Sequence, residues 1–146
     1  NTVTVSGKNS SDIWSSFRVA KRAKVNIISE TKNKVIAQHN GYRDIGVIHQ
    51  REWKFEEDRI HIIDSLNQIV YEGKAHMWFD SRLIPVKMKD KIIINDIELF
   101  FENANHIEII KTKVPNGFNE YLKSYKIEVT FNHFLNTQII TKQNFK

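Results

Sequence analysis

The segment YLKSYKIEVTF, which is Tyr121–Phe131, decides the fold class, because its side chains follow a period of two. An extended chain points successive side chains to opposite faces, so odd and even positions meet different surroundings. The even positions are mostly polar, whereas the odd ones become strongly apolar toward the end of the segment: Tyr121, Lys123, Tyr125, Ile127, Val129 and Phe131. This alternation is typical of a half-buried β-strand.

Runs of the same kind recur roughly every ten residues, the spacing of an all-β sandwich or barrel. They are Ala23–Ser29, Val35–His39, Val47–Glu56, Ile60–Asp64, Ile69–Tyr71, Ala75–Phe79, Ile84–Met88, Ile92–Phe101, Ile107–Val114 and Leu135–Thr141. Turn-forming residues separate them at Glu30-Thr31-Lys32-Asn33, Asn40-Gly41, Glu57-Asp58, Lys89-Asp90, Asn103-Ala104-Asn105 and Pro115-Asn116-Gly117. No segment shows a sustained helical period, although Phe118–Tyr125 is ambiguous. The sequence therefore predicts an all-β fold, an antiparallel β-sandwich of about ten to twelve strands.

The chain has 146 residues, of which 40% are hydrophobic and 27% charged, a balance typical of one globular domain with its own core. No linker, repeat or low-complexity tract divides it, so residues 1–146 are predicted to form a single domain. There is no cysteine, which excludes disulfides, thiolate metal sites and a cysteine nucleophile. No apolar run has the length needed to span a membrane, and no membrane partner is expected.

The formal net charge is +5 and the isoelectric point is near 9.4. A basic surface suits an anionic partner, such as an acidic polysaccharide. The lysines and arginines are scattered, without a basic run, an RNA-binding aromatic signature or a helix for a DNA groove. We therefore expect no nucleic-acid partner, and an ordinary solvated basic surface is an equal alternative to an anion-binding face.

The strand pattern at Val47–Phe55 contains two candidate binding residues. His49 and Arg51 share a face with the aromatic side chains of Trp53 and Phe55. An arginine in such a place can bind a sugar carboxylate or sulfate in bidentate fashion. The alternative, which we favour, is an internal ion pair of Arg51 with Asp64 or Asp80, because a buried charge is usually paired within the protein.

A second candidate pair lies in Gln38-His39-Asn40-Gly41-Tyr42. His39 and Tyr42 are residue types that carry protons, as a β-elimination needs. The alternative is an ordinary Asn-Gly hairpin turn at Asn40-Gly41. Asp64 is expected to organise a turn at its strand end, and His76 to be structural. None of the histidines has zinc-site spacing.

Taken in order, several short motifs resemble the C-terminal domain of the heparinase II/III family of polysaccharide lyases. They are Asn1-Thr2-Val3, Gly7, Trp14, Phe17-Arg18, Arg22-Ala23, Ala37-Gln38-His39-Asn40-Gly41-Tyr42, His49-Gln50-Arg51, Ile60–Asp64, Val114–Phe118, Ser124–Ile127 and Thr137–Ile140. The resemblance covers nearly the whole chain, through the order of the motifs rather than through any one of them. Two positions depart from the family: Asp80-Ser81-Arg82 stands where a histidine often precedes Leu83-Ile84-Pro85, and Asn119 replaces a usual glycine.

The resemblance implies a longer parent protein in which an α/α-toroid precedes this β-sandwich. Such lyases cleave uronic-acid polysaccharides by β-elimination, outside the cytoplasm of bacteria, in the periplasm or beyond. In the family the main catalytic residues sit on the toroid. A structural divalent metal is bound near a histidine that corresponds to the position before Asn1.

The sequence itself starts in a strand pattern without an initiator methionine, so we expect a piece of a longer protein. We therefore assign no catalytic residue, no metal ligand and no cofactor to this chain, and we expect it to be inactive alone. Substrate contacts are predicted at His39, Tyr42, His49 and Arg51.

The alternative functions are a non-catalytic module that binds acidic polysaccharide through a basic aromatic face, and a purely structural domain. Exposure of Trp14, Trp53 and Trp78 would favour the binding module. A large exposed apolar patch would favour a domain that has a partner. The sequence does not distinguish heparin-like, alginate and capsular substrates.

Overall fold

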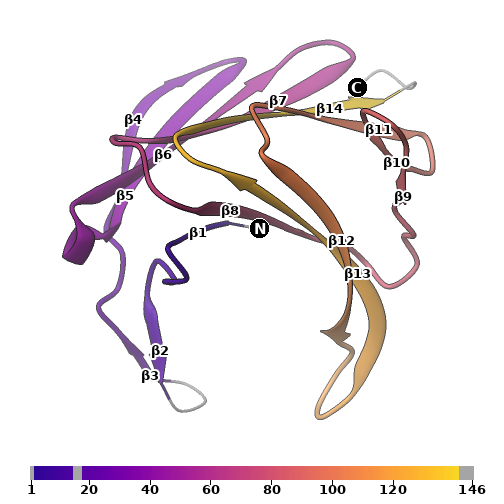
Figure 1. Cartoon of the computed structure of the whole chain (residues 1–146), viewed down its shortest axis with the longest axis horizontal. Helices are drawn as coiled ribbons and strands as arrows, with labels where there is room; N and C mark the ends of the chain where they lie inside the picture. The colour runs from indigo at the N-terminus through magenta and orange to yellow at the C-terminus, as the bar shows by residue number, and fades with distance from the viewer. Residues whose placement is uncertain (1, 15–17, 142–146) are drawn as a thin grey trace.

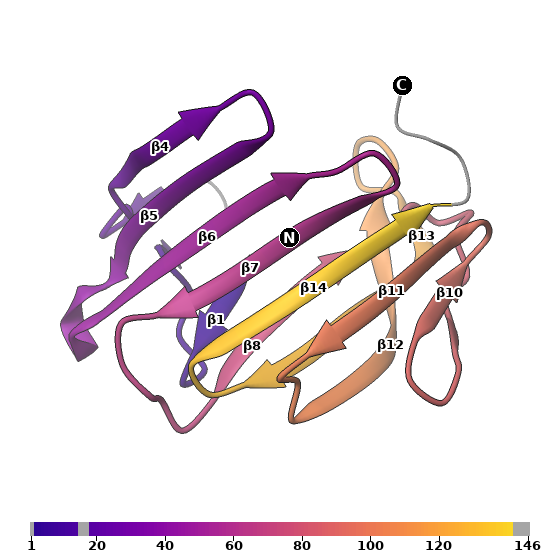
Figure 2. The same cartoon turned by 90° about the horizontal axis from the view of Figure 1, so that it is seen from above.

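The computed structural model describes residues 2–14 and 18–141, which form two antiparallel sheets packed against each other (Figure 1). The four-stranded sheet has the order β1 (Val3–Val5), β8 (Gly73–Trp78), β13 (Tyr121–Phe131) and β12 (His106–Pro115). The eight-stranded sheet has the order β4 (Val25–Thr31), β5 (Lys34–Tyr42), β6 (Val47–Phe55), β7 (Arg59–Leu66), β14 (Phe134–Thr141), β11 (Ile97–Glu102), β10 (Ile92–Ile94) and β9 (Val86–Lys87). Figure 2 shows the larger sheet from above. The described residues thus confirm the predicted antiparallel sandwich, with twelve strands in its two sheets.

The core lies between the two sheets, where the alternating strands face each other. On β13 the side chains of Ile127, Val129 and Phe131 have no exposed surface, as their spacing predicts. Tyr121, at the start of the same strand, is 64% exposed. Figure 1 shows the reason, because the far end of the β12–β13 hairpin curves away from the larger sheet.

Two of the predicted strands are wrong. Ile69–Tyr71 forms no strand, because the side-chain amide of Asn132 donates hydrogen bonds to the carbonyls of Val70 and Tyr71, at 2.9 and 2.8 Å. Ile92–Phe101 is two strands, β10 and β11, rather than one. Asn95 makes the turn between them with a φ of 52°, a left-handed conformation that asparagine tolerates better than most residues.

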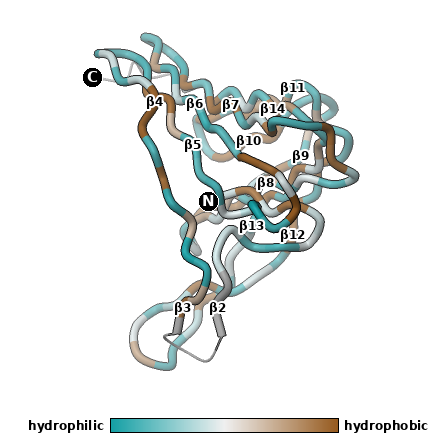
Figure 3. Tube along the Cα trace, turned by 90° about the vertical axis from the view of Figure 1, so that its left-hand side faces the viewer, coloured by the Kyte–Doolittle hydropathy of each residue, from teal (hydrophilic) through white to brown (hydrophobic). Residues whose placement is uncertain are grey.

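A two-stranded ribbon of β2 (Asp12–Trp14) and β3 (Arg18–Ala20) was not predicted. Figures 1 and 3 show it projecting below the two sheets.

The backbone conformation of Asn119 explains one departure from the family pattern. Its φ is 59°, so the backbone keeps the left-handed conformation for which glycine is usual, and asparagine preserves the turn.

Among the described residues, no helix is long and apolar enough to cross a membrane.

Candidate functional site

The candidate site is built around the carboxylate of Asp64, which is only 1% exposed. Strands β6 and β7 pair in a register that places Arg51 opposite Asp64. The guanidinium of Arg51 donates to both carboxylate oxygens, from Nε to Oδ1 at 2.7 Å and from Nη2 to Oδ2 at 3.1 Å. His49 Nε2 lies 2.6 Å from the same Oδ1. The internal pair of Arg51 with Asp64, the alternative that we favoured, is therefore confirmed.

The hydrogen bonds continue from His49 to His39, which faces it across the β5–β6 pair. His49 Nδ1 lies 2.9 Å from His39 Nε2, and the backbone N–H of Gly41 donates to His39 Nδ1 at 3.1 Å. Because His39 Nδ1 accepts this bond, the proton of the neutral ring belongs on Nε2, which donates to His49. His49 then carries its own proton on Nε2 and donates to Asp64. Each ring nitrogen of both histidines is thus engaged inside the protein.

The electrostatics fit this arrangement. Burial alone would raise the pKa of Asp64, but the hydrogen bond from His49 and the charge of Arg51 outweigh it and hold the pKa below its ordinary value. Burial lowers the pKa of His39 to about 4, and the neighbouring His49 and Arg51 act in the same direction. His39 is therefore neutral at neutral pH, as its place in the chain of hydrogen bonds requires.

Tyr42 connects the site to strand β1. Its side chain is 1% exposed, and its hydroxyl donates a hydrogen bond to the carbonyl of Val3. Burial raises the pKa of Tyr42 to about 12, and the charge of Asp64 adds to the effect. At neutral pH the hydroxyl is a hydrogen-bond donor that holds the short strand β1 in place.

Replacing Tyr42 with phenylalanine is expected to lower the free energy of unfolding by about 1–3 kcal/mol, because the buried carbonyl of Val3 loses its donor. Chemical denaturation followed by tryptophan fluorescence measures the change. The matched control is Tyr71→Phe, since Tyr71 is 95% exposed. Equal stabilities of the two variants would show that the bond to Val3 contributes nothing.

Stability is also expected to fall on acidification from pH 6.5 to about 4. In this window His39 is protonated in the unfolded chain, where its pKa is the ordinary 6.5, but stays neutral in the folded protein, where its pKa is about 4. Proton binding therefore favours the unfolded state. His76, whose pKa is also lowered, chiefly by burial, acts with the same sign. Denaturation midpoints over a pH series measure the slope. His39→Gln should flatten it, and an unchanged slope in this variant would contradict the role given to His39.

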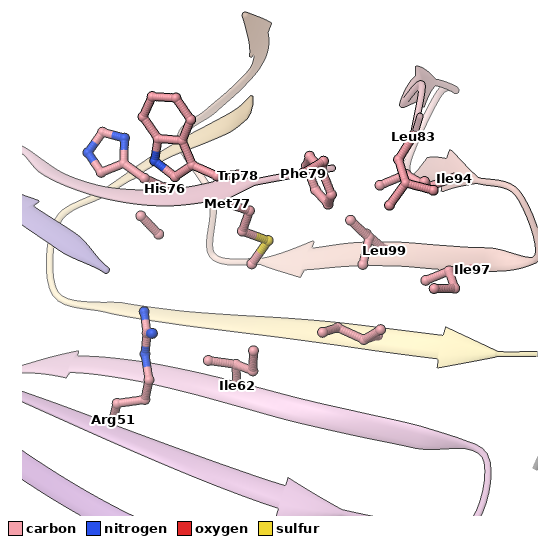
Figure 4. Close-up of a pocket in the computed structure, with 12 residues that line it drawn as sticks. Arg51, Ile62, His76, Met77, Trp78, Phe79, Leu83, Ile94, Ile97 and Leu99 are labelled. Carbon is pink, nitrogen blue, oxygen red and sulfur yellow. The ribbon is translucent and has the colours of Figure 1, made fainter. Parts of the chain in front are cut away.

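An open cleft of about 250 Å³ runs beside this network. Its lining includes His39 and Arg51, together with Thr2 from the N-terminal segment and Trp53 from β6. A separate apolar cavity of about 210 Å³ lies between the sheets. Figure 4 shows Arg51 reaching into it from one side and Met77 from the other, while His76 and Trp78 point to the opposite side of β8.

The structure brings all four predicted contact residues together around Asp64, and whether they touch a substrate stays a prediction. One alternative and one expectation are wrong. Asn40-Gly41 is no hairpin turn, because it lies within β5 at an irregularity between His39 and Tyr42, and the chain turns later through η1 (Arg43–Ile45). Asp64 organises no turn, because it lies inside β7 as the buried partner of Arg51. Its bond to His49 was missed, although a carboxylate that directly follows Ile62 and Ile63 was the available signal.

The metal that the family resemblance implies is not accounted for by this network. His39 and His49 offer no unused ring nitrogen, and the described residues contain no group of three or more ligand side chains that would suit an ion. The residues present therefore do not fit a metal by themselves. A metal near the position before Asn1 stays a prediction.

The fold and the site define a β-sandwich domain with a buried His–His–Asp–Arg network beside an open cleft. The family model described as "Heparinase II/III-like, C-terminal" matches residues 1–118, and the chain belongs to this family. No sequence among the curated proteins matches the chain.

The solved structures that match include two with a similar fold. "Heparinase III-BT4657 gene product" is 12% identical with a TM-score of 0.64, and the match covers 96% of this chain. Heparan sulfate lyase HepC from Pedobacter heparinus is 17% identical with a TM-score of 0.66, and the match covers 95% of this chain. In both cases the chain spans 23% of the length of the solved protein.

Proposed function

We propose that this chain is the C-terminal β-sandwich of a polysaccharide lyase that cleaves uronic-acid polysaccharide by β-elimination, and that it is inactive alone. The family supports this, and so do the names of the two similar structures, a heparinase and a heparan sulfate lyase. In this proposal the 146 residues are one domain that follows an α/α-toroid, and the whole protein works in the periplasm or outside the cell.

The observation that carries the proposal of inactivity is that the proton-carrying side chains near the cleft already form hydrogen bonds within the protein. β-Elimination needs a base for the proton alpha to the uronate carboxylate and an acid for the leaving oxygen. The hydroxyl of Tyr42 is buried on Val3, and the ring nitrogens of His39 and His49 are bonded internally. The acid and the base therefore come from the rest of the parent protein, and this domain forms a wall of its cleft.

In this proposal Arg51 contributes to substrate binding through its charge. Its guanidinium is fixed by Asp64, and the residue is part of the lining of the cleft beside His39. A fixed cation near a uronate carboxylate favours the negative charge that develops on that group during elimination.

The exposed apolar surface of β4 supports a partner domain. Val25 and Ile27 are each 66% exposed and Ile28 is 53% exposed, and Figure 3 shows apolar colour along this strand. β4 is the edge of the larger sheet, where an uncovered apolar strand invites association. A patch of this kind is expected on a domain that packs against the rest of a larger protein.

The experiment that tests the proposal is a substrate panel for the full-length protein. Formation of unsaturated sugar ends is followed by ultraviolet absorbance with several uronate polysaccharides and with a neutral glucan. The proposal predicts cleavage of at least one uronate polysaccharide and none of the glucan. Absence of unsaturated ends on every uronate substrate would contradict the lyase activity.

A second candidate, a non-catalytic module that binds acidic polysaccharide, is favoured by Trp78. This side chain is 43% exposed on the outer face of β8, and Lys126 Nζ lies 5.4 Å from its ring centroid. An exposed ring beside a cation suits the apolar face and the acid group of a uronate. Trp53 is half-buried in the cleft, and the side chain of Trp14 lies outside the described residues. Tight binding by the full-length protein without cleavage would favour this module.

A further inference from the structure

A polar pocket of about 330 Å³ has Gly41 and Tyr42 in its lining, close in sequence to His39 of the network. One wall is the loop after β1, residues 7–11, and the other is the segment 41–45, with Lys21 at the base of the β2–β3 ribbon. Most of the residues that line it have polar or charged side chains: Lys8, Asn9, Ser10, Ser11, Lys21, Arg43 and Asp44.

The walls of this pocket are held in place by the backbone. The loop after β1 is closed by paired bonds between Val5 and Lys8, and Ser6 N donates to Glu72 O at 2.8 Å. The opposite wall packs against it so closely that a Cβ on Gly41 would lie 2.3 Å from the carbonyl oxygen of Ser10. Only glycine permits this approach, so the pocket is built into the fold.

Positive charge dominates the pocket. Lys21 Nζ is bonded to Asp44 Oδ2 at 2.9 Å. The hydrogen bond and charge of Lys21 lower the pKa of Asp44, and the charges of Arg43 and Lys8 act in the same direction to a smaller extent. Within the described part of the chain, no carboxylate lies at ion-pair distance from Lys8 or Arg43. Lys8, Lys21 and Arg43 thus line the pocket together with Asp44, whose carboxylate is already bonded to Lys21.

The uncharged side chains add hydrogen-bond donors. Ser10 and Ser11 line the pocket with Asn9, and the hydroxyl of Ser11 keeps its proton to donate while its oxygen accepts from Ala23 N at 3.1 Å. Two cations without carboxylate partners, in a pocket with hydroxyl and amide donors, match an oxyanion.

We propose that this basic pocket binds one oxyanion of an acidic polysaccharide, either a sulfate ester or a uronate carboxylate. The ligand class rests on the proposed function, whereas the anion site itself rests on the pocket. On β5, His39 of the cleft and Gly41 of the pocket are two residues apart, roughly 7 Å of extended chain. The pocket and the cleft are thus close enough for a single polysaccharide chain to contact both.

The test measures dissociation constants of the full-length protein for heparin, for its fully desulfated form and for a neutral glucan. The variant is the double substitution Lys8→Ala and Arg43→Ala, which removes two exposed side chains and leaves the Lys21–Asp44 pair intact. The matched control is Lys113→Ala with Lys123→Ala, an exposed cross-strand pair on the β12–β13 hairpin that removes the same charge.

The pocket variant is expected to weaken binding of an acidic polysaccharide about tenfold or more relative to the control, as loss of charge-assisted contacts implies. A larger loss with heparin than with its desulfated form identifies the ligand as sulfate, and equal losses identify it as carboxylate. Equal dissociation constants for the pocket variant and the control would overturn the proposal. Because the experiment measures binding, it tests the pocket even if the protein has no lyase activity. If the protein is an active lyase and the pocket variant binds as tightly as the control, only this inference is refuted.

Discussion

Replacing Asp64 with asparagine is expected to lower the free energy of unfolding by about 3–5 kcal/mol, the usual cost of removing one partner from a buried ion pair. The side chains of Arg51 and His49 are only 15% and 4% exposed, and both donate to this carboxylate. An asparagine in its place removes the negative charge that faces the guanidinium and offers only one acceptor oxygen. Urea denaturation at neutral pH measures the loss.

The matched control for this variant is Asp58→Asn. Arg59 donates to both oxygens of Asp58, at 3.1 Å each, in the same bidentate geometry. That pair is open to solvent, with side chains 34% and 50% exposed, so its loss should cost no more than about 1 kcal/mol. If the two substitutions destabilise the protein equally, the network around Asp64 does not have the structural role described above.

Replacing Phe131 with alanine is expected to cost about 3–5 kcal/mol, because a fully buried aromatic ring leaves a cavity between the sheets. Phe131 has no exposed surface and lies at the end of β13 beside Gly73 of β8. The loss is a large share of the total stability of a typical domain. Thermal and urea unfolding measure it.

Phe118→Ala is the corresponding control, since this phenylalanine is 92% exposed in the turn between β12 and β13. Its replacement should change stability by no more than about 0.5 kcal/mol. A large loss at Phe118 together with a small loss at Phe131 would contradict the assignment of the core.

The strands in which apolar and polar side chains alternate clearly were predictable, because a strand that is buried on one face needs this alternation. Ile127, Val129 and Phe131 are buried as their spacing predicts. The turn at Asn95 was missed because Ile92–Phe101 is apolar on both sides of a single Asn-Asp pair. The β2–β3 ribbon was missed because its strands have only three residues each, too few to show a period.

The candidate site was only partly predictable, because it depends on register. His39 faces His49, and Arg51 faces Asp64, only in the pairing that the structure shows. A slip of one residue would turn each side chain to the opposite face of the sheet. The irregularity between His39 and Tyr42 sets this register, and the Asn-Gly pair gave a misleading signal for a turn at that place. The residue types pointed to the partners of Arg51, but the link from His39 to Asp64 needed the structure.

The proposed division of work between this domain and the rest of a longer parent protein is tested most directly by one comparison. The rate of formation of unsaturated sugar ends is measured for this chain alone and for the full-length protein, at equal molar concentration, on the same uronate polysaccharide. The proposed function predicts that the full-length protein cleaves, and the internal hydrogen bonds of Tyr42, His39 and His49 predict that this chain alone does not. Cleavage by this chain alone would contradict the account and would assign the acid and base to these side chains.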